Sequence, residues 1–193
     1  MIGAMSLSLN DERKPALVPE VPPGAEVITL GSGCFWCTEA VFDRVAGVLA
    51  VTSGYMGGHV ENPTYEQICD ADTGHAEVTR IVYDPAKAPL PKLLDVFWKS
   101  HDPTTPDRQG ADVGPQYRSA IFYETDAQRD IAEKSKAAAQ PKFSDPIVTE
   151  ITKAGPFYPA ERYHQDYYQR NKTRNPYCHV VIAPKLGKLG MDT

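Results

Sequence analysis

Two cysteines, Cys34 and Cys37, stand three residues apart in the segment 31–39, which reads Gly-Ser-Gly-Cys-Phe-Trp-Cys-Thr-Glu. An apolar run at 27–30 precedes the glycines and a helix-like run follows, so we expect a strand that turns into a helix beginning near Cys34. Unpaired N–H groups and the positive end of a helix dipole stabilise a thiolate placed there. Phe35 and Trp36 offer an apolar surface. The segment therefore predicts sulfur redox chemistry on a substrate with an apolar group.

Cys34 is the candidate nucleophile, although free cysteines are most often small buried hydrophobic residues. The glycine before it and its place at a helix start favour the reactive thiol. The spacing to Cys37 also fits a thioredoxin-like pair, but such pairs usually enclose small residues or proline rather than two bulky aromatic rings. A zinc site completed by Cys69, Cys178 or a histidine is a further alternative. It has weak support, because no second Cys-x-x-Cys pair is present.

Two polar segments are candidates for acid–base groups. In the segment 62–77, Glu77 begins an apolar strand, and burial at the edge of a pocket would raise the pKa of this carboxyl and make it a general acid. Spacing alone instead favours a solvated glutamate at the end of a strand. The segment 112–117 is either a structural turn or a loop that delivers carboxylate and hydroxyl groups. His164 is expected to be a half-buried, hydrogen-bonded imidazole rather than a catalyst.

The chain has 193 residues, enough for one domain with a substantial core. Its net charge of −5 gives no reason to expect a nucleic-acid partner. Four cysteines are too few for a disulfide framework and are expected to be reactive or buried thiols in a reducing compartment. No apolar run approaches membrane length and the N-terminus lacks a secretory pattern, so we expect a cytoplasmic protein with no membrane partner.

The elements that must position these residues alternate along the chain. We expect an α+β fold: a ferredoxin-like two-layer α/β sandwich with a mixed sheet and long irregular loops. Residues 1–24 are expected to form a flexible arm, and residues 25–193 a single domain with a mobile C-terminal tail from about residue 172. The expected strands are 27–30, 48–52 (ending in a turn at 54–58), 77–83, 119–123 and 147–152. One helix is expected to begin near Cys34, and three others to span 89–101, 125–139 and 160–170. A long loop is expected at 102–117.

Five short motifs occur together and in order along this chain. They are Gly33-Cys34-Phe35-Trp36, Asn62-Pro63-Thr64-Tyr65, Thr73-Gly74-His75-Ala76-Glu77, Gln116-Tyr117-Arg118-Ser119-Ala120 and Tyr163-His164-Gln165-Asp166-Tyr167. The set closely resembles peptide methionine sulfoxide reductases of the A type. The resemblance covers about residues 26–182, nearly the whole expected domain.

This resemblance implies the reduction of methionine S-sulfoxide, free or in oxidised proteins, with thioredoxin as the reductant and no metal or organic cofactor. It implies that Cys34 attacks the sulfoxide sulfur and becomes a sulfenic acid, while Glu77 gives a proton to the sulfoxide oxygen. The substrate-binding residues that it implies are Tyr65 and Tyr117 at the oxygen, Asp112 in a loop around the pocket, and Phe35 and Trp36 at the methyl group. A neutral but strongly dipolar sulfoxide needs such donors and such an apolar slot.

A second thiol must resolve the sulfenic acid, and two candidates remain open. Cys178 lies in the C-terminal tail, where many members of that family keep a resolving cysteine, and is favoured as the first resolver. Cys37 departs from the family pattern, which has glycine after the tryptophan, and is one helical turn from Cys34. It would form the disulfide directly or act as a relay. Cys69 is expected to be buried, without a required role.

For the leading function a monomer is expected. Two other functions remain as alternatives. A general thiol–disulfide oxidoreductase built on Cys34 and Cys37 would reduce insulin-type disulfides without needing Glu77. A zinc-binding interaction module would carry stoichiometric zinc.

Overall fold

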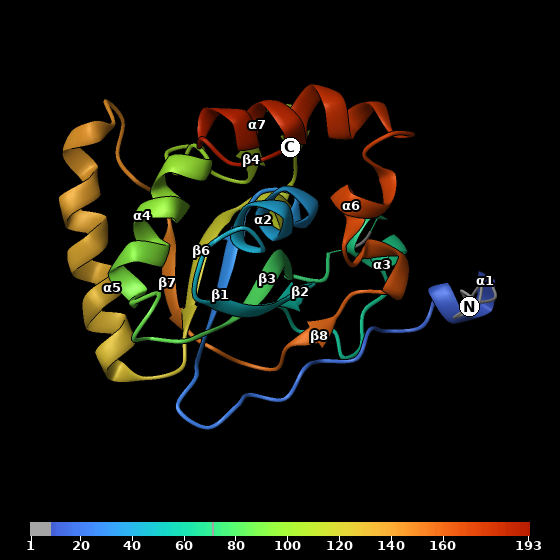
Figure 1. Ribbon diagram of the computed structural model, residues 1–193, viewed down its shortest axis with the longest axis horizontal. Helices are drawn as coiled ribbons and strands as arrows, with labels where there is room; N and C mark the ends of the chain where they lie inside the picture. The colour runs from blue at the N-terminus through green and yellow to red at the C-terminus, as the bar shows by residue number, and fades with distance from the viewer. Residues whose placement is uncertain (1–8, 71) are drawn as a thin grey trace.

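The computed structural model describes residues 9–70 and 72–193, with a six-stranded mixed sheet at its centre (Figure 1). From edge to edge its strands are β7 (Glu150–Lys153), β6 (Ser119–Tyr123), β1 (Glu26–Ser32), β3 (Ala76–Tyr83), β2 (Val48–Met56) and β8 (Tyr158–Pro159). β6 and β7 are parallel, and all other neighbours are antiparallel. The α+β prediction with a mixed sheet is confirmed. Each predicted strand overlaps an observed one, although residues 147–149 precede β7.

Four helices pack around this sheet. α2 (Phe35–Phe42), α4 (Leu90–Ser100) and α5 (Asp126–Ala139) contact it directly, and α5 also packs beside α4. α7 (Ala183–Lys188) lies across the top in Figure 1. The predicted helix 89–101 is confirmed by α4, whose apolar face is buried. The predicted start of α5 is confirmed as well, because Thr125 Oγ1 accepts the backbone N–H of Gln128 at 3.2 Å. The other α-helices of the described residues are α1 (Leu9–Glu12), α3 (Tyr65–Asp70) and α6 (Tyr167–Asn171).

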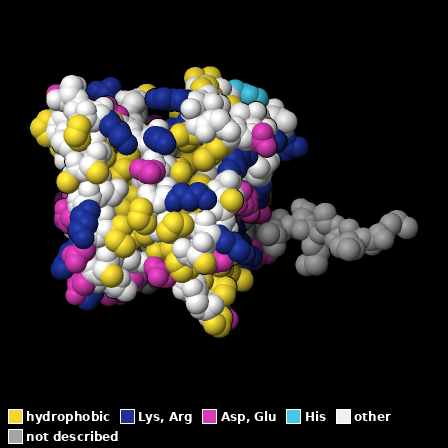
Figure 2. Space-filling model, turned by 60° about the vertical axis from the view of Figure 1, so that its left-hand side comes forward, with side chains coloured by type: hydrophobic (Ala, Val, Ile, Leu, Met, Phe, Trp, Pro, Cys, Tyr) yellow, Lys and Arg dark blue, Asp and Glu magenta, His cyan; other side chains and the backbone are white. Residues whose placement is uncertain are grey.

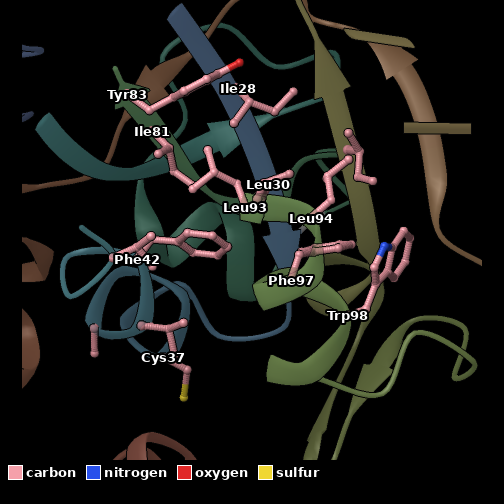
Figure 3. Packing of buried hydrophobic residues seen from close by; sticks show 14 of the residues in the cluster. Ile28, Leu30, Cys37, Phe42, Ile81, Tyr83, Leu93, Leu94, Phe97 and Trp98 are labelled. Carbon is pink, nitrogen blue, oxygen red and sulfur yellow. The ribbon is translucent and has the colours of Figure 1, made fainter. Parts of the chain in front are cut away.

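Alternation along β3 sends its side chains to two faces of the sheet. Ile81 joins the main core with Phe42 (Figure 3), whereas Ala76 and Val78 join a smaller cluster on the opposite face. Since side chains alternate along a strand, Glu77 shares the face of Ile81. The fold therefore turns this carboxyl toward the helices rather than toward solvent.

β2 runs straight through Gly54, where the sequence predicted a turn. Gly54 pairs with Pro159 of β8, and a Cβ atom on it would lie 2.5 Å from both the ring of Phe157 and the carbonyl oxygen of Tyr158. Glycine here permits a close approach of two chain segments, not a change of direction. The prediction of a turn beginning at 54 is wrong, and β2 ends only at Met56.

The predicted helix 160–170 is also wrong, because two short segments replace it. A 3-10 turn at Arg162–His164 and α6 are separated by Asp166, whose φ of 52° interrupts a right-handed helix. The side chain of Gln165 accepts the N–H of Ser53 at 2.9 Å and donates to its carbonyl at 3.0 Å. The side chain of Gln165 therefore bonds to β2 where the two segments meet.

The loop predicted at 102–117 contains a small hairpin of β4 (Arg108–Gln109) and β5 (Asp112–Val113), followed by a 3-10 turn at Pro115–Tyr117. At the other end, Cys178–Ile182 forms a π-helical segment that leads into α7, and Cys178 is fully buried. The mobility expected of the tail stays a prediction.

The predicted N-terminal arm lies partly outside the described residues, which begin at Leu9. The N–H of Ala16 donates to the carbonyl of Ala160 at 3.0 Å, so part of the arm lies against the domain. Its flexibility stays a prediction. Within the described part of the chain, no helix is long and apolar enough to cross a membrane. On the face shown in Figure 2, positive, negative and hydrophobic side chains are interspersed.

Candidate active site

Cys34 is the N-cap residue of α2, which confirms the predicted helix start. The preceding Gly33 has a φ of 87°, and a Cβ atom on it would lie 2.6 Å from the side chain of Gln109, so the turn requires glycine. The backbone N–H of Phe35 has no partner within the helix and donates to Oε2 of Glu77 at 3.0 Å. One helix start therefore holds both a thiol and a carboxyl.

Glu77 is only 1% exposed, which overturns the solvated glutamate that spacing alone favoured. The cause is its place on the helix-facing side of β3, a central strand. Burial raises the pKa of Glu77 to about 8, with the N–H of Phe35 opposing the rise. The carboxyl is therefore mostly protonated at neutral pH and can donate a proton.

A cavity of about 110 Å³ lies over this helix start. It is lined by Cys34, Phe35, Trp36, Tyr65, Glu77, Asp112, Tyr117 and Tyr177. Every substrate-binding residue predicted from the sequence is among them, whereas Cys37 and Cys178 are not. A larger hollow of about 590 Å³ lies elsewhere, between the C-terminal end of α4 and α7, and holds none of the predicted site residues.

Tyr177 is a lining residue that the sequence reasoning missed. Its hydroxyl donates to Oδ2 of Asp112 at 2.9 Å and lies 3.8 Å from Sγ of Cys37. This contact joins the β4–β5 hairpin to the C-terminal segment. The only signal in the sequence is that Tyr177 directly precedes Cys178.

Two residues that the prediction did not use, Tyr167 and His164, contact Trp36 in the cavity wall. The ring of Trp36 stacks on Tyr167 with centroids 3.6 Å apart and planes at 5°. Its Nε1–H donates to Nδ1 of His164 at 2.9 Å. His164 is hydrogen-bonded as expected, but it is fully buried rather than half-buried.

The thiols of Cys34 and Cys37 interact beneath the cavity. The interaction with Cys34 lowers the pKa of Cys37 to about 7, and Lys185 adds to this effect. Burial and the neighbouring Cys37 raise the pKa of Cys34, so the expected stabilisation of its thiolate by the helix start is wrong: the N–H of Phe35 donates to Glu77 instead. Since proton transfer between the two sulfurs moves the charge, the pair ionises as one unit near neutral pH. Figure 3 shows Cys37 at the edge of the main core with its sulfur turned away from Phe42.

The other two cysteines differ sharply in exposure. Cys178 belongs to the main core, and burial raises the pKa of its thiol. Cys69 is exposed, so its predicted burial is wrong: α3 is a short helix whose buried residue is the neighbouring Ile68. All four cysteines are free. Among the described residues, no three His, Cys, Asp or Glu side chains form a cluster that could hold a metal ion.

The fold and the cavity together define an oxidoreductase that works through thiols. The family model described as peptide methionine sulfoxide reductase matches residues 26–192. The peptide methionine sulfoxide reductase MsrA 1 of Rhodopirellula baltica is 57% identical over 170 residues, which cover 88% of each chain. The chain therefore belongs to the peptide methionine sulfoxide reductase family and is an oxidoreductase that reduces methionine S-sulfoxide in peptides.

Solved structures agree with this assignment. Mxr1 from Saccharomyces cerevisiae in reduced form is similar with a TM-score of 0.76 at 36% identity, over 82% of this chain and 92% of that one. Mxr1 in complex with Trx2 is similar with a TM-score of 0.55 at 30% identity, over 77% of this chain and 89% of that one.

Proposed function

We propose that the sulfoxide is reduced in the cavity at the start of α2, with Cys34 as the nucleophile and Glu77 as the general acid. The observation that supports this proposal most is the bond from the N–H of Phe35 to Glu77, which holds the carboxyl at the helix start that Cys34 caps; both side chains line one cavity. At about 110 Å³, the cavity is small beside the roughly 300–1,000 Å³ of typical small-molecule sites. It suits the end of one side chain of a protein substrate.

The proposed reaction transfers one oxygen atom. Cys34 transfers its proton to the Cys37 thiolate, and the Cys34 sulfur attacks the sulfoxide sulfur while Glu77 protonates the sulfoxide oxygen. The S–O bond to methionine breaks, the oxygen ends on Cys34 as a sulfenic acid, and Glu77 is left as a carboxylate. Methionine sulfur gains the two electrons that Cys34 loses. Burial raises the pKa of both Tyr65 and Tyr117, so their hydroxyls stay protonated and can donate to the oxygen. Phe35 and Trp36 would enclose the methyl group.

We propose that Cys37 resolves the sulfenic acid first, although the sequence favoured Cys178. Cys37 interacts directly with Cys34 in the reduced protein, and this interaction is the main cause that lowers the pKa of its thiol to about 7. The Cys37 sulfur would attack the Cys34 sulfur and form the disulfide, and the proton of Cys37 and the hydroxyl group of the sulfenic acid would leave as water. Cys178 is buried, and burial together with the charge of Cys37 raises the pKa of its thiol. It would exchange with Cys37 next, through movement of the tail from about residue 172.

A dithiol protein of the thioredoxin type is the proposed reductant, a proposal supported by the similarity to Mxr1 in complex with Trx2. We further propose that the protein is a cytoplasmic monomer that also accepts free methionine sulfoxide. We place the fold in the ferredoxin-like class. The neighbour order β6–β1–β3–β2 and the succession β1–α2–β2–β3–α4–β6 support that class.

Methionine release from each sulfoxide epimer, with dithiothreitol as reductant, tests the proposed function. The S epimer should be reduced, and Cys34→Ser should abolish the reaction. Cys69→Ser is the matched control, because Cys69 is exposed and outside the cavity lining, and it should remain active. Turnover of the R epimer alone, or wild-type activity in Cys34→Ser, would refute the proposal. Reduction of insulin disulfides at equal rates by wild type and Glu77→Gln would favour the general oxidoreductase instead.

A further inference from the structure

We propose that His164, which does not line the cavity, is a positioning residue that fixes Trp36 for substrate binding. The inference rests on the proposed role of Trp36 in the methyl-binding wall. His164 is fully buried and touches three lining side chains at once. Its ring centroid lies 5.0 Å from that of Phe35, 5.6 Å from that of Trp36 and 4.4 Å from that of Tyr65.

The hydrogen bond from Trp36 assigns the form of the imidazole. Nδ1 of His164 accepts the indole N–H at 2.9 Å, so Nδ1 carries no proton and Nε2 carries the one proton of a neutral ring. If both ring nitrogens of His164 were protonated, its Nδ1–H would face the indole N–H of Trp36 and no hydrogen bond could form. Burial lowers the pKa of His164 to about 3, which keeps the acceptor available across the range in which enzymes work.

The rest of the surroundings restrict His164 itself. Its Nε2 makes no hydrogen bond within the described residues and lies 3.9 Å from Oε2 of Glu161. Glu161 in turn accepts the N–H of Tyr65 at 2.9 Å and the hydroxyl of Tyr55 at 3.1 Å. One short segment thus supports both the start of α3 and the indole of Trp36.

Trp36 is consequently fixed from three directions. Tyr167 covers one face of the indole, Tyr177 meets it edge-on with centroids 5.8 Å apart, and His164 holds the N–H. Stacking restrains the plane of the ring but allows it to slide, whereas the hydrogen bond fixes its rotation within that plane. His164 therefore sets where the indole edge lies in the cavity.

Two substitutions distinguish the role of His164 as a hydrogen-bond acceptor from its role as an aromatic ring. His164→Phe keeps an aromatic ring and removes the acceptor, whereas His164→Asn keeps an acceptor near the position of Nδ1 and removes the ring. We expect His164→Phe to raise KM for methionine S-sulfoxide about three- to tenfold, as the loss of one hydrogen bond implies, with kcat within about twofold of wild type. His164→Asn should restore most of this loss.

The indole N–H resonance of Trp36 gives a readout independent of activity. In a Trp98→Phe background it is the only tryptophan signal, since the chain has two tryptophans. The resonance should move upfield and its hydrogen exchange accelerate in His164→Phe, but stay near the wild-type values in His164→Asn. An unchanged resonance in His164→Phe would overturn the hydrogen bond, and an unchanged KM with a shifted resonance would overturn the positioning role.

If His164→Phe does not fold, His164→Asn decides alone. Retention of the Trp36 resonance and of KM supports the proposal, and loss of either contradicts it. A wild-type protein that does not reduce the sulfoxide would refute the proposed function. The Trp36 resonance would still report on the hydrogen bond between Trp36 and His164.

Discussion

The backbone N–H of Phe35 and the carboxyl of Glu77 are joined by a 3.0 Å hydrogen bond between α2 and β3. The donor is one of the orphan N–H groups at a helix start, and it occupies Oε2 of the carboxyl. Oε1 is then the oxygen free to carry the proton. Because Cys34 caps the same helix, a shift of α2 would displace the thiol and the carboxyl together.

Glu77→Gln should lower kcat/KM by about 10²- to 10⁴-fold, because glutamine keeps the shape of the side chain but donates no carboxylic proton. The wild-type rate should fall as pH rises through about 8, where Glu77 loses its proton. That alkaline limb should be absent in the variant. Steady-state kinetics between pH 6 and 10 give the comparison. Glu133→Gln, an exposed change on α5, is the control and should keep the wild-type profile.

Cys37→Ser should accumulate a Cys34 sulfenic acid that dimedone traps after a single turnover without reductant. Cys178→Ser should instead form a disulfide between Cys34 and Cys37, since these two thiols interact directly in the reduced protein. Peptide mapping of quenched samples distinguishes the two variants. Rapid formation of a Cys34–Cys178 bond in Cys37→Ser would show that Cys178 is the first resolver after all.

Glu39 should make the folded protein less stable as pH rises. This buried carboxyl of α2 accepts the N–H of Tyr167 at 3.1 Å, and burial raises its pKa to about 7 from a reference of 4.5. The native state therefore holds this proton more tightly than the unfolded chain. The stabilisation is complete below about pH 4.5 and is lost as pH rises to about 7, by on the order of 3 kcal/mol.

Urea denaturation at pH 5 and pH 8 measures this effect. Glu39→Gln cannot ionise, so its free energy of unfolding should fall less between the two pH values than that of wild type. Glu133→Gln again serves as the exposed control. An equal fall in wild type and Glu39→Gln would contradict the assignment.

Gly33→Ala should impair both stability and turnover. The residue has a φ of 87° and no room for a Cβ atom beside Gln109. We expect a loss of about 1–3 kcal/mol in the free energy of unfolding, together with a lower kcat because the turn that aims Cys34 must move. Gly155→Ala, where no atom lies within 4 Å of the added Cβ, is the matched control. Equal thermal stability of the two variants would refute the steric argument.

Local signals predicted much of this fold because they depend on short windows of sequence. Apolar spacing located α4, and Thr125 located the start of α5. Gly54 and the segment 160–170 were misread because their conformations depend on pairing with β8 and on Gln165 binding Ser53. Such contacts between distant segments leave no local pattern, and tertiary context overrides propensity.

In the site, too, local motifs were predictable and contacts between distant segments were not. The motif resemblance located the residues that line the cavity, including Tyr65 and Asp112. It did not reveal that Tyr177 lines the cavity, or that His164 and Tyr167 contact Trp36. The burial of Glu77 follows from the face of β3 on which it lies. Spacing along one strand separates its two faces but does not tell which of them the helices cover.

The pairing of Trp36 with His164 spans 128 residues, and that of Cys37 with Tyr177 spans 140. A ribosome adding about 5–20 residues per second therefore completes the thiol pair on the order of ten seconds before it makes the residues that cover it. During synthesis the two thiols are present without Tyr177, Cys178 or the tyrosine that stacks on Trp36. A growing chain therefore carries both thiols before Tyr177 and α7 are made.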